Sequence, residues 1–163
     1  MFLTELQTVR CPETIPGNQL IAVYRKFNPF STLNPKYRLT EDLVWKCPFT
    51  SIIITIPAGF VTDYASVPRG LHWLIPPDGP YAKAAVLHDY LYATGIYSRS
   101  ISDGIFKQAM SETSIPLTYQ YILFNGAILC GKASWDKWRQ LQSSDVDTWR
   151  VRSGIACEYS MPA

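Results

Sequence analysis

The residues best placed to do chemistry in this sequence gather around His88, one of only two histidines in the chain. His88 lies in an otherwise apolar segment with helical composition, and Tyr92, four residues further on, shares its helix face. Asp103 follows on the next expected helix, and the short connection predicts a helical hairpin that brings Asp103 close to His88. A neutral histidine takes a proton from water when a carboxylate holds its other ring nitrogen. The pattern therefore predicts His88 as a general base, Asp103 as its orienting group and Tyr92 as a supporting hydroxyl.

Two further acidic positions suggest a cation. Asp89 lies next to the expected base and, with loop carbonyls, is compatible with a hard ion such as calcium. Asp63 and Ser66 lie in a second motif, residues 58–69, and are typical capping residues that accept backbone N–H groups. In the functional interpretation, Asp63 faces His88 as a metal ligand or a second acid. Apart from calcium, no cofactor is expected.

The same residues also support a structural interpretation. A histidine in an apolar helix is often satisfied by a carboxylate of a neighbouring helix, and an ion pair between Asp89 and Arg99 would fix the hairpin. Buried polar networks specify packing as readily as they specify reactions. Residue types alone leave a structural network and a catalytic site both open.

These residues must be positioned by strands and helices, and the order of the expected strands and helices predicts an α+β fold. It has an N-terminal antiparallel β-sheet followed by a C-terminal bundle of about three helices. Runs rich in β-branched residues predict strands at 19–24, 37–40, 42–46 and 51–56, with a return strand at 60–62 after the turn 57–59. Apolar periodicity predicts helices at 81–94, 100–110 and 115–131. Pro80 is expected in the first helical turn and Gly95 at its end. We expect one domain over residues 1–163, with a β-rich part at about 1–70, a helical part at about 80–131 and an aromatic and basic tail at 132–163.

Composition narrows the function classes. With 47% hydrophobic and 17% charged residues, the chain has enough apolar surface to fold, and a net charge of +2 is too small to indicate nucleic-acid binding. The four cysteines lack C-x-x-C spacing, so free thiols are expected, although a disulfide such as Cys11–Cys157 fits the sequence as well. No apolar run reaches the ~20 residues of a membrane span, and the N-terminus has no signal-peptide pattern. We therefore expect a soluble protein synthesised in a cytoplasm.

Three ordered motifs carry a resemblance to a known family. Residues 59–68, residues 84–92 and the Ser98-Arg99 pair followed by Asp103 resemble an uncharacterised domain family of tailed bacteriophages and prophages, labelled a domain of unknown function. The resemblance covers about residues 50–115. It implies a virion component of the tail or baseplate, whose partners are other phage structural proteins and further copies of itself. In that case the His–Asp cluster, with Arg99, Asp63 and Ser66, is mainly structural.

A second resemblance supports the alternative function. The motif His88-Asp89-x-x-Tyr92, with Asp103 on the following helix, is similar to the helix pair of phospholipase A2. This similarity implies that His88 is the general base, that Asp89 binds calcium and that Asp103 orients the histidine. The alternative is therefore a metal-assisted hydrolase directed at the host envelope, acting on lipid or on the cell wall.

Overall fold

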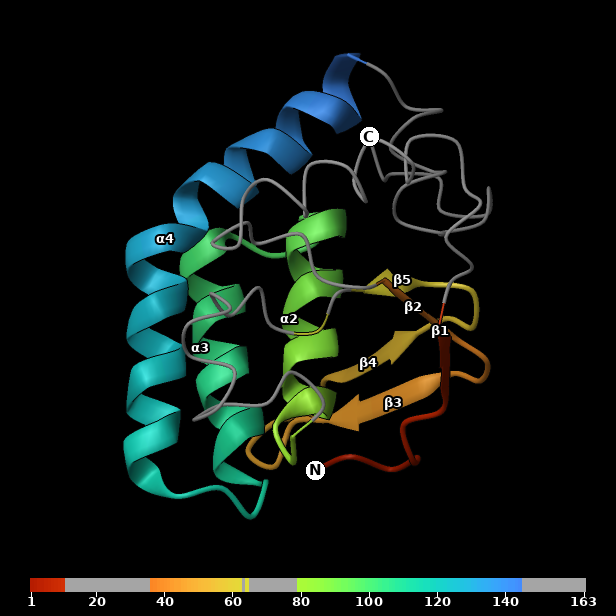
Figure 1. The fold of residues 1–163 in the computed structure, drawn as a ribbon, viewed down its shortest axis with the longest axis vertical. Coiled ribbons are helices and arrows are strands. Elements are labelled where there is room, and N and C mark those ends of the chain that lie inside the picture. The colour runs from red at the N-terminus through yellow and green to blue at the C-terminus, as the bar shows by residue number, and fades with distance from the viewer. Residues whose placement is uncertain (11–35, 63, 65–78, 145–163) are drawn as a thin grey trace, which may run out of the picture.

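The computed structural model describes residues 1–10, 36–62, 64 and 79–144, which form two small sheets and three helices (Figure 1). One sheet has the order β1-β2-β5 and the other pairs β3 with β4, and all the pairs are antiparallel. The strands are β1 (Thr8–Arg10), β2 (Tyr37–Leu39), β3 (Leu43–Lys46), β4 (Ile53–Ile56) and β5 (Val61–Thr62). The expected α+β class, with strands first and helices after them, is confirmed.

The pairing of the strands differs from the sequence-based expectation. β4 pairs with β3, whereas β5 pairs with β2 and does not return along β4. The turn explains the change: Gly59 adopts a φ of 92°, and its N–H donates to the carbonyl of Leu39 next to β2. β1 is too short to show a sequence pattern and was not expected. The expected strand at 19–24 lies outside the described residues.

α2 (Ala82–Thr94) is the central helix and carries His88. It lies between the strands and the other two helices, and ten of its residues are buried (Figure 1). Gly95 ends the helix as expected, with a φ of 64° and its N–H donating to the carbonyl of Leu91. Pro80 lies just before the N-cap Tyr81, outside the helix where it was expected.

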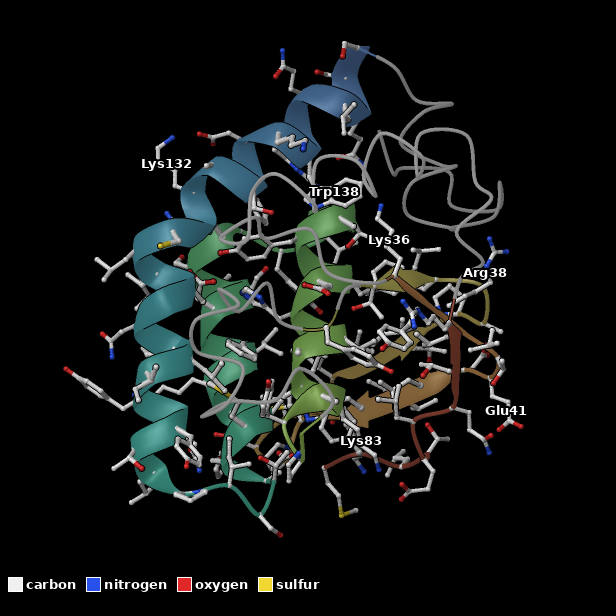
Figure 2. The ribbon with its side chains drawn as sticks, viewed as in Figure 1. Lys36, Arg38, Glu41, Lys83, Lys132 and Trp138 are labelled. Atoms are coloured by element: carbon white, nitrogen blue, oxygen red, sulfur yellow. The ribbon has the colours of Figure 1, made fainter. Side chains whose placement is uncertain are left out.

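α3 (Arg99–Ser111) and α4 (Leu117–Ser144) complete the helical layer. Ser98 caps α3 through its side-chain oxygen, which accepts from the N–H of Ile101. α4 continues 13 residues beyond Gly131, where we expected the helix to end and the tail to begin. The continuation is helical because Trp138 and Leu141, three residues apart, pack against the core. Trp138 lies on the inner side of α4, whereas Lys132 extends outward (Figure 2).

One hydrophobic core joins the two layers. Trp45, Ile56, Phe60, Leu87 and Met110 come from both strands and helices, and each is almost completely buried in the same cluster. None of the helices described here is long and apolar enough to cross a membrane. Cys47 and Cys130 are free thiols, and Cys11 and Cys157 lie outside the described residues.

Candidate functional site

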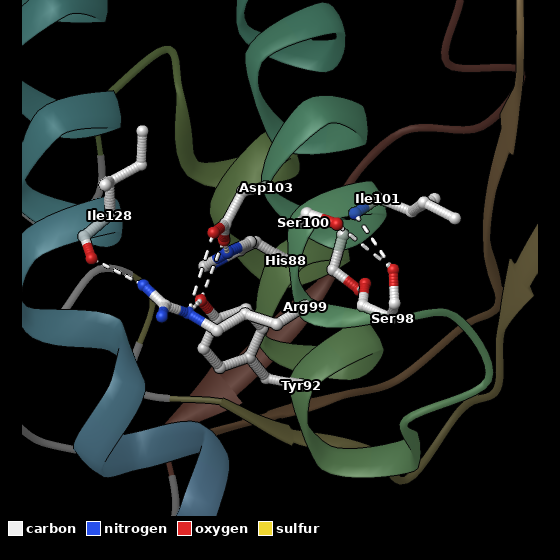
Figure 3. Close-up of polar contacts among 9 residues, drawn as sticks. His88, Tyr92, Ser98, Arg99, Ser100, Ile101, Asp103 and Ile128 are labelled. Atoms are coloured by element: carbon white, nitrogen blue, oxygen red, sulfur yellow. Dashed lines mark hydrogen bonds and ion pairs between the residues drawn. The ribbon is translucent and has the colours of Figure 1, made fainter.

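The hairpin of α2 and α3 brings His88 and Asp103 together, as the sequence predicted. Residues 95–98 connect the two helices, and Nε2 of His88 lies 2.9 Å from Oδ1 of Asp103 (Figure 3). The side chain of Asp103 is only 9% exposed, so its carboxylate depends on protein groups rather than on water for hydrogen bonds. The His88–Asp103 pair is the centre of the candidate site.

Two more side chains complete the shell around this carboxylate. The hydroxyl of Tyr92 donates to the same oxygen of Asp103 at 2.7 Å. Nε of Arg99 donates to the Tyr92 hydroxyl at 3.3 Å and lies 3.7 Å from Oδ2 of Asp103. Nη2 of Arg99 also donates to the carbonyl of Ile128 on α4 at 2.5 Å, so all three helices contribute to the site (Figure 3).

Aromatic rings fix the plane of the imidazole. The His88 ring stacks on Phe106, with ring centroids 4.5 Å apart, and lies 4.2 Å from the Tyr92 ring. Tyr92 in turn packs edge-on against Trp135 at 5.2 Å. The hydrogen bond to Asp103 and these contacts leave the imidazole little freedom to turn, which is the preorganisation that a general base needs.

The network shifts the protonation equilibria of its members. Burial opposes ionisation of Asp103, but the hydrogen bonds from His88 and Tyr92 outweigh it and lower the pKa of Asp103. Burial raises the pKa of Tyr92 to about 12, so its hydroxyl keeps its proton near neutral pH. The hydrogen bond to Tyr92 raises the pKa of Arg99. An ionised Asp103 between a neutral tyrosine and a charged arginine is therefore the resting state.

The second nitrogen of the imidazole is available for chemistry. Nδ1 of His88 makes no hydrogen bond to any of the described residues, and the side chain is 13% exposed. The ring is therefore held on one side by Asp103 and keeps part of its surface exposed. With Nε2 held by Asp103, Nδ1 is the ring nitrogen left to accept a proton.

Asp89 connects this site to the second sequence motif. Its Oδ2 accepts a hydrogen bond from the Thr62 hydroxyl at 2.5 Å, and the same hydroxyl oxygen accepts from the N–H of Tyr64 at 2.9 Å. Tyr64 has a φ of 63°, a conformation that residues other than glycine rarely adopt. The end of β5 therefore lies beside Asp89, one residue from the candidate base.

The structure does not form the ion pair considered for Asp89, and it does not describe two other residues of the expected site. Arg99 forms its ion pair with Asp103, so the expected pair between Arg99 and Asp89 was wrong. The reason is geometric: Asp89 lies about 100° around α2 from His88 and is turned toward β5. Asp63 and Ser66 lie outside the described residues. Within the ranges that the structure describes, no three His, Cys, Asp or Glu side chains gather as a metal site.

Residues from the second half of α4 support the site and were not predicted. Arg139 donates to the carbonyls of Tyr92, Ala93 and Thr94 at 2.6 to 3.0 Å and so caps the C-terminus of α2. A Cβ on Gly131 would lie 2.6 Å from the Tyr92 hydroxyl, so only glycine allows this close approach. In the sequence, Trp135 and Trp138 lie three residues apart in the tail, and this helical spacing is the one signal for a buried side there.

A protein-family model described as "Protein of unknown function (DUF1353)" matches residues 37–126. The chain belongs to the DUF1353 family. The expected resemblance to a domain of unknown function is thereby confirmed. Neither the curated proteins nor the solved structures gave a match. The DUF1353 segment contains the whole hairpin of α2 and α3, whereas Trp135 and Arg139 lie beyond it.

Proposed function

We propose that the chain is a hydrolase in which Nδ1 of His88 removes a proton from water. The observation that carries the proposal is the asymmetry of the imidazole: Nε2 is held by Asp103, while Nδ1 has no hydrogen-bond partner among the described residues and the side chain is 13% exposed. A network that served packing alone would gain by satisfying both nitrogens of a nearly buried ring. The ring nitrogen without a partner therefore favours the catalytic interpretation over the purely structural one.

The reaction needs only the ring, water and an acyl substrate. Water gives a proton to Nδ1 of His88, and its oxygen attacks the carbonyl carbon to form a tetrahedral oxyanion. The imidazolium is stabilised by ionised Asp103, whose low pKa keeps it charged. When the intermediate collapses, the bond to the leaving oxygen breaks and that oxygen takes the proton back from Nδ1.

The similarity to the phospholipase A2 helix pair points to the substrate class. In the matching positions, the hydroxyl of Tyr92 and Nε2 of His88 meet the same oxygen of Asp103. We therefore propose a carboxylic ester of a phospholipid as substrate. From the resemblance to tailed-phage domains, we also propose that the enzyme is phage-encoded and acts on the host envelope.

Calcium is a separate part of the proposal. Calcium takes six to eight oxygen ligands, whereas among the described residues Asp89 belongs to no group of three or more acidic, histidine or cysteine side chains that could hold a metal ion. The described donor set does not hold calcium by itself, so the proton transfer is assigned to the ring alone. If Asp89 and Asp63 do bind the ion, millimolar calcium should raise the melting temperature of the wild type by mass action and leave Asp89→Asn unchanged. An equal melting temperature with and without calcium would contradict the calcium site.

The decisive experiment measures fatty-acid release from phospholipid vesicles by the purified protein, with and without calcium. We expect His88→Asn to reduce the rate at least about 100-fold, the lower range of general-base catalysis. Asp103→Asn should also slow the reaction, because the ring loses its orienting charge. The matched control is Glu41→Gln, which changes an exposed acidic residue between β2 and β3 and should leave the rate unchanged.

The result distinguishes the two interpretations of the cluster. A wild type without activity on phospholipid or cell-wall substrates, together with a large loss of stability in His88→Asn, would establish a structural network instead. Activity that survives in a folded His88→Asn variant would place the chemistry elsewhere.

A role in a virion is the second candidate, and the apolar outer surface of α4 favours it. Large apolar side chains exposed on one helix face are typical of contacts in an assembly. We propose a tail or baseplate component, and the two functions are compatible. Quantitative mass spectrometry of gradient-purified particles tests the location: fixed stoichiometry with tail proteins supports it, and absence from particles rejects it.

A further inference from the structure

The guanidinium of Arg99 contacts groups on all three helices. Its Nε donates to the hydroxyl of Tyr92 on α2 at 3.3 Å and lies 3.7 Å from Oδ2 of Asp103 on α3. Its Nη2 donates to the carbonyl of Ile128 on α4 at 2.5 Å (Figure 3). The proton transfer proposed for His88 gives Arg99 no part, although its charge lies within the same network.

The hydrogen bonds that begin at Arg99 run in one direction. A guanidinium has donors and no acceptor, so the Tyr92 oxygen accepts from Arg99 and its single hydrogen is given to Asp103. An ionised carboxylate only accepts, so the proton between Asp103 and His88 is on Nε2 of the imidazole. The chain of donors therefore starts at Arg99 and leaves the lone pair of the ring on Nδ1 of His88.

Arg99 also determines how the carboxylate of Asp103 is turned. Oδ1 of Asp103 receives two hydrogen bonds, one from Nε2 of His88 and one from the Tyr92 hydroxyl. Oδ2 lies near the guanidinium and has no other hydrogen bond or ion pair among the described residues. Without Arg99 the carboxylate can rotate and exchange its two oxygens, and the imidazole then loses its fixed acceptor.

The first half of α4 holds both partners of the hydrogen bond between Arg99 and Tyr92. The carbonyl of Ile128 accepts from Nη2 of Arg99, which restrains a long side chain that is otherwise free to move. Gly131, three residues further along α4, lies against the Tyr92 hydroxyl, since a Cβ there would be 2.6 Å from its oxygen. The donor and the acceptor are therefore fixed by the same segment of one helix.

We propose that Arg99 is a positioning residue that acts through Tyr92 and Asp103. It holds the imidazole of His88 in the orientation and tautomer that direct the lone pair of Nδ1 to water. Arg99 makes no hydrogen bond to His88 itself, so the effect passes through the two intermediate side chains. The consequence for catalysis rests on the proposed hydrolase function, whereas the effect on the ring is independent of any substrate.

Proton and nitrogen NMR of the full chain measures the imidazole directly. The chain has two histidines, so the spectrum is simple, and His72→Asn assigns the signals of His88. In the wild type we expect the tautomer with hydrogen on Nε2 and a low-field Nε2 proton that exchanges slowly with water. Arg99→Met should lose this proton signal and should populate the other tautomer. Arg38→Met, at an exposed position on β2, is the matched control and should keep both features (Figure 2).

A conservative variant separates positioning from stability. Arg99→Lys keeps the charge, but an ammonium lacks the planar fork that serves three partners at once, so it should restore only part of the low-field signal. Circular dichroism verifies the fold of each variant. A folded Arg99→Met variant that keeps the wild-type signal overturns the proposal, even if its stability is reduced. Where Arg99→Met does not fold, a complete wild-type signal in Arg99→Lys overturns it.

The rate of fatty-acid release measures the effect on catalysis. We expect Arg99→Met to lower kcat about 10- to 100-fold and to leave KM close to the wild-type value, because Arg99 positions the base and does not hold the substrate. In a Tyr92→Phe background the effect of Arg99→Met should be at least about threefold smaller, because the same path is already interrupted. Equal effects in the two backgrounds, or a higher KM with unchanged kcat, would overturn the path through Tyr92.

The NMR and rate measurements separate this proposal from the proposed function. A wild type without activity, together with loss of the His88 signal in Arg99→Met, would reject the hydrolase and keep the role of Arg99 at the His88–Asp103 pair. Activity that requires His88 but is unchanged in Arg99→Met would keep the hydrolase and reject the positioning role.

Discussion

At the scale of single residues, Asp103 is the group on which the site depends. Its pKa is lower in the folded protein than the ordinary value of about 3.9, so its contribution to stability is present above that pH. The contribution is lost as the pH falls through the lower, folded pKa. We therefore expect the free energy of unfolding to decrease below about pH 4, measured by urea denaturation at a series of pH values.

Asp103→Asn should cost about 1–3 kcal/mol at pH 7, because the donors that converge on the carboxylate keep only a neutral partner. The free energy of unfolding of the variant should also decrease less than that of the wild type below about pH 4. Asp136→Asn is the control, since an exposed ion pair contributes about 0–1 kcal/mol. Equal losses in the two variants would show that the buried network adds nothing beyond surface charge.

For Tyr92 we expect the opposite pH dependence: its contribution to stability is lost at high pH. Its pKa is raised to about 12 from an ordinary value near 10, so the folded state favours the protonated hydroxyl. The resulting stability is complete below about pH 10 and is lost as the pH rises toward 12. Tyr92→Phe should lose about 1 kcal/mol at pH 7 and should show a smaller decline between pH 10 and 12. A decline as steep as that of the wild type would assign the alkaline transition to another group.

At the scale of the elements, the junction of α2 with α4 tests how the hairpin is held. Gly95 has a left-handed φ, and a Cβ there would overlap the guanidinium of Arg139. We expect Gly95→Ala to lower stability by more than 1 kcal/mol, measured by thermal unfolding. Gly104→Ala on α3 is the matched control: a Cβ there meets nothing within 4 Å, so alanine should stabilise by about 0.5–1 kcal/mol. Similar effects at the two positions would contradict the capping role of Arg139.

The sequence predicted the elements better than their connections. Apolar periodicity located α2 and α3, and the spacing of His88 and Asp103 on a tight hairpin predicted their contact, because both signals are local. Strand pairing depends on which edge a turn faces, and the pairing of β5 with β2 follows from the conformation of Gly59 rather than from any residue type. The contact of Arg99 with the backbone carbonyl of Ile128 on α4 could not be predicted, because every residue has such a carbonyl and its partner is not marked by any residue type.

At the scale of the whole molecule, the site lies within the DUF1353 match but depends on a supporting segment that the match does not contain. The matched residues 37–126 include His88 and Asp103, but Trp135 and Arg139 come from the second half of α4. In the sequence, Arg139 looks like a surface residue because it is charged and lies in the aromatic and basic tail. In the structure its guanidinium stacks on Trp135 and satisfies three carbonyls at the end of α2. The second half of α4 is therefore part of the functional unit.

This dependence predicts that Arg139 controls the hairpin from outside the matched segment. Arg139→Met should lower stability by about 2–4 kcal/mol, because three carbonyls lose a charged donor in a buried place. Arg139→Lys should recover only part of the loss, since an ammonium lacks the planar fork that reaches all three. Hydrogen exchange resolves the cause: faster exchange at the end of α2, with unchanged exchange in β3 and β4, would show a local loss of the cap. Lys132→Met is the control on the exposed side of α4. Faster exchange at the end of α2 in this control would contradict the capping role of Arg139.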